Sequence, residues 1–144
     1  MKVEQCCDYL LIYLNNYYLF DFDNKDMIEK DIKKIFKKLK RYYHINLKGS
    51  YKVDILKDDY YGVILKIKED NYSYDYFYKD KLSLKIKLKK VEILYEINDI
   101  FNDLDNAELI KDRNTVYLKL KNIIGKKEYL NLIENSKMHI NYDI

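Results

Sequence analysis

The sequence predicts an α+β fold: a mostly antiparallel sheet with one long amphipathic helix packed on one face, and a short C-terminal helix. Apolar residues recur at three- and four-residue steps over segment 25–43, which is the period of a helix. Apolar and polar residues alternate over several shorter segments, as in strands with one buried face. Turn-like residues at 57–59 separate two of those segments, so we expect a hairpin there, and residues 112–114 are flanked by two further segments of this kind.

The composition is that of one ordered domain with a strong codon bias. The chain has 144 residues, of which 48% are hydrophobic and 35% charged, and this balance disfavours disorder. No Pro-, Gly- or Ser-rich linker and no repeat is visible, so we expect a single domain over 1–144. The 17 tyrosines and the absence of proline and tryptophan favour amino acids with AT-rich codons. A low-GC bacterium, its phage or a mobile element would fit, and this bias lowers the functional weight of lysine and tyrosine clusters.

The first half of the chain predicts strands around one helix. Segment 9–22 is aromatic and branched, which favours β structure, either a hairpin turning at Asn15 and Asn16 or one long strand. Asp23 and Asn24 can cap the helix that runs to about Tyr43. Its apolar stripe consists of Ile28, Ile32, Ile35, Phe36, Leu39, Tyr42 and Tyr43.

The middle of the chain alternates strongly. Residues 51–55 and 61–67 predict a hairpin, whereas the aromatic run 72–78 gives no clear prediction. Residues 82–88 predict the strongest strand. Residues 91–97 continue the alternation in the opposite phase, so we expect a turn or bulge near Lys89 and Lys90.

The C-terminal part predicts shorter elements. We expect a helical turn over 99–104, strands over 107–110 and 115–120, a helix over 126–137 and a final strand over 138–144.

An acidic and aromatic segment over 58–80 is the best local candidate for a protein interface. Tyrosine offers a large contact area with a polar tip, and the interspersed acids could dock a basic partner or imitate nucleic acid. The alternative is a tyrosine-rich strand that covers the core. The candidate interface residues are Tyr60, Tyr61, Tyr72, Tyr74, Asp75, Tyr76 and Tyr78.

Two sets of cations are candidates for contact with nucleic acid. A net charge of +3 is mild, so a dedicated nucleic-acid binder is not indicated. Electrostatic binding to phosphates could still use lysines of the helix and of the strongest strand. The alternative is an ordinary solvated face on each element. The candidate residues are Lys33, Lys34, Lys37, Lys38 and Arg41 on the helix, and Lys85, Lys87 and Lys89 on the strand.

Catalytic signatures are sparse in this sequence. A thiol enzyme would need Cys6 or Cys7 beside His44 or His139, and nothing in the sequence pairs them. The two adjacent cysteines lack the spacing of a metal site, and the 3 glycines are too few for a phosphate-binding loop. We therefore expect no catalytic residues, no cofactor and no bound metal.

The leading hypothesis is a non-enzymatic protein-binding module, a small cytosolic regulator or inhibitor. A nucleic-acid binder is the alternative, and a small thiol-dependent enzyme is a weaker one. The start of the chain lacks the basic head and apolar run of a signal peptide, and no apolar run of about 20 residues occurs. Two unspaced thiols favour a reducing compartment. We therefore expect a cytoplasmic protein that does not interact with membranes.

Overall fold

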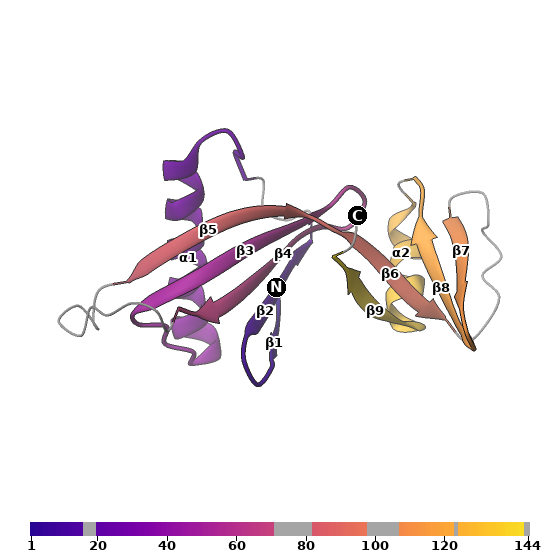
Figure 1. Ribbon diagram of the computed structural model, residues 1–144, viewed down its shortest axis with the longest axis horizontal. Helices are drawn as coiled ribbons and strands as arrows, with labels where there is room; N and C mark the ends of the chain where they lie inside the picture. The colour runs from indigo at the N-terminus through magenta and orange to yellow at the C-terminus, as the bar shows by residue number, and fades with distance from the viewer. Residues whose placement is uncertain (16–19, 71–81, 98–106, 123, 143–144) are drawn as a thin grey trace. The chain divides into compact units, whose positions relative to one another are not determined.

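The computed structural model describes residues 1–15, 20–70, 82–97, 107–122 and 124–142. Contacts divide the chain into two compact units, each containing one sheet and one helix (Figure 1). The first unit consists of Met1–Leu56 and Val63–Lys89, and the second of Lys57–Gly62 and Lys90–Ile144. The single-domain organisation stays a prediction.

The first sheet has five strands in the order β1-β2-β4-β3-β5. β1 pairs with β2 and β2 with β4, both in antiparallel register. β5 lies at the other edge and runs parallel to β3, because Ser83 N–H donates to Gly49 C=O at one end and Val91 N–H donates to Lys57 C=O at the other. The strands are β1 Lys2–Gln5, β2 Leu10–Asn15, β3 Ser50–Asp58, β4 Gly62–Glu69 and β5 Ser83–Lys90.

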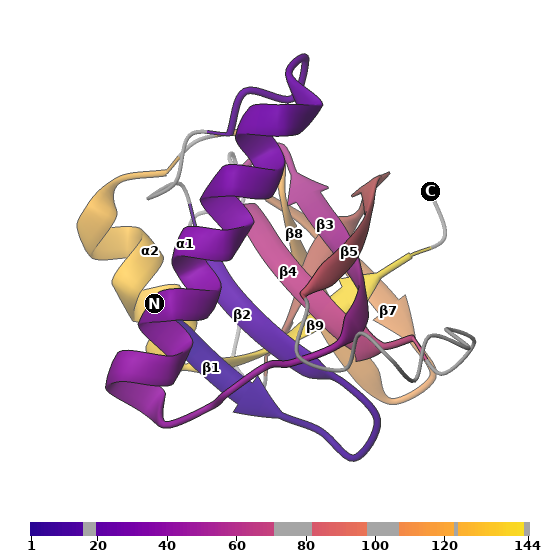
Figure 2. The same cartoon turned by 90° about the vertical axis from the view of Figure 1, so that its left-hand side faces the viewer.

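Helix α1, Lys25–Tyr43, lies against one face of this sheet (Figure 2). The Asn24 side chain accepts a hydrogen bond from Met27 N–H, which satisfies one of the free donors at the helix start. The helix ends at His44, which adopts a left-handed conformation with φ of 57°. From Ile28 to Leu39 the apolar stripe is buried in one cluster with β2, β3 and β4. Tyr42 and Tyr43, which were predicted to continue the stripe, are exposed.

The second sheet has four strands in the order β7-β8-β6-β9, with every adjacent pair antiparallel. Its strands are β6 Glu92–Ile97, β7 Ala107–Asp112, β8 Thr115–Leu120 and β9 Ser136–Asn141. Helix α2, Lys126–Glu134, precedes β9 and contacts it. The buried side chains of this unit include Ile93, Tyr95, Leu118, Leu120 and Leu132.

The sequence prediction of a mixed fold with antiparallel strands is confirmed, but the strands form two sheets rather than one. The reversed phase after Lys90 is the reason: Val91 lies where the chain leaves β5 of the first sheet and enters β6 of the second. It is not a bulge within one sheet. The alternation predicts strands but does not say which sheet each strand joins.

Smaller differences concern the ends of elements. Strand β1 was not predicted, because Val3 is its only apolar residue and gives no alternating pattern. Polar residues are common on an exposed edge strand. The second strand expected within 9–22 is absent over 20–22, and 16–19 lie outside the described residues. The helix predicted over 126–137 ends at Glu134, so the last strand begins earlier than expected. The predicted turn over 99–104 also lies outside the described residues.

Candidate functional site: a polar pocket at the β3–β4 turn

Asp58 fixes the turn between β3 and β4 to the start of β6. Its Oδ1 accepts hydrogen bonds from the backbone N–H groups of Tyr60 and Tyr61, each at 2.8 Å. Its Oδ2 accepts from Ile93 N–H, also at 2.8 Å. An aspartate at the start of a turn commonly bonds the backbone two and three residues later, and Gly62 completes the turn with a φ of 111°. One carboxylate thus satisfies three backbone donors within the second unit.

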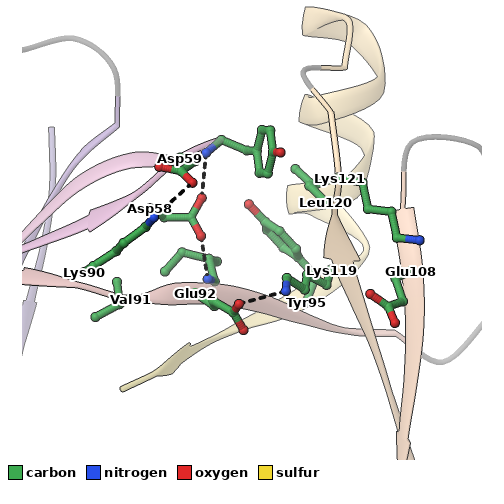
Figure 3. Close-up of a pocket in the computed structure, with 12 residues that line it drawn as sticks. Asp58, Asp59, Lys90, Val91, Glu92, Tyr95, Glu108, Lys119, Leu120 and Lys121 are labelled. Atoms are coloured by element: carbon green, nitrogen blue, oxygen red, sulfur yellow. Dashed lines mark hydrogen bonds and ion pairs between the residues drawn. The ribbon is translucent and has the colours of Figure 1, made fainter. Parts of the chain in front are cut away.

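A pocket of about 380 Å³ opens beside this turn, within the second unit. The ladder between β6 and β8 ends at the pair Leu94 and Lys119, and Lys119 also lines this pocket. We call this cavity the turn pocket (Figure 3). Its walls are Asp58, Asp59, Tyr60, Lys90, Val91, Glu92, Ile93, Tyr95, Glu108, Lys119, Leu120 and Lys121.

The charges on the wall of the turn pocket are mixed, with four carboxylates against three lysines. Lys119 Nζ lies 2.7 Å from Glu92 Oε1, and both side chains are about one third exposed. Lys90 Nζ lies 3.6 Å from Asp59 Oδ2, and this pair is more exposed. Two of the three lysines are therefore compensated by wall carboxylates.

Two buried phenols lie in this part of the second unit. Tyr95 is 1% exposed, and Figure 3 shows its ring rising from β6 between the turn and Leu120. The hydroxyl of Tyr95 and that of Tyr129 on α2 are both buried, and neither has a hydrogen-bond partner among the described residues. Buried hydroxyls are usually paired, so an unpaired phenol on the wall of a cavity indicates a place where another polar group can bind.

Burial and the nearby charge of Asp58 both raise the pKa values of these hydroxyls. Burial is the main cause that raises the pKa of Tyr129 to about 12; interaction with the Tyr95 hydroxyl lowers this pKa, and the negative charge of Asp58 raises it. Burial also raises the pKa of Tyr95, with smaller contributions from Tyr129 and Asp58. The two hydroxyls lie close enough for a hydrogen-bond-like interaction to act on both pKa values, but their geometry is not that of a hydrogen bond. The pKa of Lys119 is raised, mainly by its hydrogen bond to Glu92 and further by Glu108 and Asp58.

An alkaline loss of stability follows from these phenols. In the unfolded chain a tyrosine ionises near pH 10, whereas Tyr129 in the folded chain stays protonated up to about pH 12. Stability is therefore complete below pH 10 and falls as the pH rises through this window, by about 1.4 kcal/mol per pH unit for each such tyrosine. Urea unfolding between about pH 8 and about pH 11 measures this fall. Tyr129→Phe should make it shallower, and an unchanged slope would contradict the assignment.

The predicted interface residues are divided by the structure. Tyr60 is partly exposed and lines the turn pocket, together with Asp58 and Asp59 of the same segment. Tyr61 is 5% exposed, so its side chain is directed inward rather than to a surface. The other predicted members lie outside the described residues: Tyr72, Tyr74, Asp75, Tyr76 and Tyr78.

The two predicted lysine sets lie on opposite sides of the first sheet. The cations of α1 lie opposite its buried stripe; Lys34, Lys37 and Arg41 are exposed, and Lys33 pairs with Glu29. On β5, Leu84 and Ile86 pack against the same cluster as α1, so the alternating lysines face the other way. A single phosphate track over both sets is therefore not formed.

Two of the three β5 lysines are also compensated by carboxylates. Lys85 Nζ lies 3.1 Å from Oδ2 of Asp70, a carboxylate only 2% exposed, and Lys89 Nζ lies 3.2 Å from Asp54 Oδ2. Phosphate contact by either lysine set alone stays a prediction.

The thiols and imidazoles named as possible catalytic groups each have local partners. Cys6 Sγ lies 3.9 Å from Glu4 Oε1, while Cys7 is exposed. His44 forms the end of α1. His139 Nε2 lies 2.7 Å from Glu96 Oε2, and its ring meets that of Tyr117 edge to face. None of these contacts joins a thiol to an imidazole, and the thiol-enzyme alternative stays a prediction.

Sequence reasoning missed most of the turn pocket. The alternation of its strand places Tyr95 in the core and gives no sign of a pocket. Nothing in the sequence distinguishes Glu92, Glu108 and Lys119 from other polar residues on strands. The wall combines segments 58–60, 90–95, 108 and 119–121, and no sequence motif spans such separations. Two signals were available: the predicted turn over 57–59, which contains Asp58, and the candidate interface residue Tyr60.

Two further observations concern the part of the chain that the structure describes. No three of its histidine, cysteine, aspartate and glutamate side chains are grouped so that they could hold a metal ion. None of its helices combines the length and apolarity that a membrane crossing requires.

Comparisons with known proteins leave the turn pocket to be interpreted from its own geometry. The chain matches no protein-family model, no curated protein and no solved structure.

Proposed function

We propose that this chain is a non-enzymatic protein-binding module, and that it binds a basic segment of a partner protein at the turn pocket. The observation that carries the proposal is the pocket itself: four carboxylates and a partly exposed tyrosine border a cavity that contains a buried phenol without a partner. The first residues of the acidic and aromatic segment, Asp58 to Tyr60, supply one of its walls.

The dimensions of the pocket favour recognition of side chains. A volume of about 380 Å³ lies at the small end of the range for ligand pockets, enough for one or two side chains of a bound segment. Exposed charges around a cavity steer a partner of opposite charge and select against like charge. A small intracellular regulator or inhibitor that binds and covers a basic region of its partner is the role that fits these properties.

A charge reversal on β7 tests the proposal with a matched control. Glu108 and Asp112 are exposed carboxylates on the same strand, but only Glu108 lines the turn pocket. Immobilised wild type, Glu108→Lys and Asp112→Lys are incubated with lysate of a low-GC bacterium, and a retained protein is then purified and titrated calorimetrically.

The expected result is a partner whose affinity falls more than about tenfold for Glu108→Lys and changes little for Asp112→Lys. Equal affinity for all three forms, or retention of no protein, would refute the proposal.

A further inference from the structure

The turn pocket carries an excess of negative charge that its own lysines do not cancel. Four carboxylates face three lysines, which leaves one negative charge. The pairs Glu92–Lys119 and Asp59–Lys90 account for two charges of each sign. The remaining wall charges are Asp58, Glu108 and Lys121. Asp58 is stabilised by backbone N–H groups, which are dipoles and carry no full positive charge.

The buried phenols add oxygen lone pairs to this negative environment. Tyr95 lines the cavity, and its buried hydroxyl has no hydrogen-bond partner among the described residues. The hydroxyl of Tyr129 is also buried and unpaired there, but Tyr129 does not line the cavity. A phenol oxygen can accept a hydrogen bond as well as donate one. Because Asp58 acts on both hydroxyls, the group best stabilised beside them is a donor that carries positive charge.

We propose that the turn pocket receives the cationic side chain of a lysine or arginine from the partner, with the Tyr95 hydroxyl accepting one of its N–H donors. Asp58 and Glu108 compensate the charge of the inserted group. This inference rests on the proposed function and specifies the group that the pocket recognises.

An anionic group fits the same place poorly. Next to Tyr95 it would face the charge of Asp58, and the lysines Lys90 and Lys119 already pair with wall carboxylates. Of the three pocket lysines, Lys121 alone has no ion-pair partner among the described residues. An apolar side chain would leave the buried Tyr95 hydroxyl unsatisfied, which is costly in a site shielded from water.

The test uses two short fluorescent peptides, one of alternating serine and lysine and one of alternating serine and norleucine. Norleucine keeps the length of the side chain and removes the charge. Fluorescence anisotropy at low salt compares their affinities for wild type, Tyr95→Phe and Tyr117→Phe. Tyr117 serves as the matched control, because it lies in the same sheet but does not line the pocket.

We expect the lysine peptide to bind and the norleucine peptide to bind at least about tenfold more weakly, since hydrogen bonds to charged groups are among the stronger ones. Tyr95→Phe should weaken the lysine peptide by about tenfold, while Tyr117→Phe should leave it unchanged. The free Tyr95→Phe protein should be at least as stable to urea as wild type, because the substitution removes an unpaired buried hydroxyl. Weaker binding together with undiminished stability cannot result from misfolding.

The outcomes separate failure of the inference from failure of the proposed function. If the lysine peptide binds equally well to wild type and to Tyr95→Phe, the insertion of a cation beside Tyr95 is wrong, while binding of a basic segment stands. If Tyr95→Phe is less stable than wild type and its affinity is unchanged, the hydroxyl serves a bound water molecule instead. If neither peptide binds and no partner is captured, the proposed function itself fails.

Discussion

Replacing Ile32 by alanine is expected to lower the free energy of unfolding by about 2–5 kcal/mol. Ile32 is fully buried at the centre of α1 and belongs to the cluster that joins this helix to β2, β3 and β4. Deleting its outer carbons removes buried apolar contacts and leaves a cavity that the surrounding strands fill only in part. The helix depends on these contacts, because amphipathic helices gain most of their stability from packing rather than from intrinsic propensity.

Urea unfolding followed by far-ultraviolet circular dichroism measures this loss, with Lys34→Ala as the control. Lys34 is exposed on the opposite side of the same helix, and alanine is the better helix former. The control should change stability by less than about 0.5 kcal/mol. A loss of less than about 1 kcal/mol for Ile32→Ala would contradict the packing of α1 on the sheet.

Replacing Asp58 by alanine is the second large effect, with an expected loss of about 3 kcal/mol. The carboxylate accepts hydrogen bonds from Tyr60, Tyr61 and Ile93 N–H groups, and hydrogen bonds to a charged acceptor exceed the usual strength. Without it, three partly buried backbone donors lose their acceptor. Asp58→Asn should cause an intermediate loss of stability, because the amide keeps one oxygen that accepts hydrogen bonds. Its NH2 group replaces the other oxygen, so a donor would then face a backbone N–H group.

The neighbouring Asp59 is the matched control for this substitution. Its ion pair with Lys90 is largely exposed, and such pairs contribute little to stability. Asp59→Ala should therefore cost less than about 1 kcal/mol in the same urea experiment. Equal losses for the two aspartates would contradict the role assigned to Asp58.

Local patterns predicted the elements of this fold where one face is strongly apolar. The stripe from Ile28 to Leu39 predicted the helix, and the alternation in β3, β6 and β8 reflects one more deeply buried face on each strand. β1 lacked such a signal because only Val3 faces apolar neighbours. In the sequence, the division into two sheets appeared only as a change of phase in the apolar alternation at Val91. A turn or a bulge within one sheet would change the phase in the same way.

The candidate site was less predictable than the fold, for a physical reason. Asp58, Tyr95 and Lys119 come together only because β6 pairs with β8 and because the β3–β4 turn bonds Ile93. These are long-range contacts, whereas the sequence patterns report neighbours along one strand or helix. The clusters of lysine on α1 and β5 were the conspicuous features, yet they face opposite sides of one sheet.

The path of the chain through the two units limits how the protein can be divided into fragments. Residues 57–62 belong with 90–144, although 63–89 belong with the N-terminal unit, so no single cut separates the units. A fragment beginning at Lys90 would lack the aspartate that accepts the Ile93 N–H bond, and with it one wall of the turn pocket. Gene truncation, limited proteolysis and domain exchange at this boundary should all yield a second unit with an incomplete site. Inserting a linker within the turn is therefore a more selective way to abolish the site, because both sheets keep all their strands.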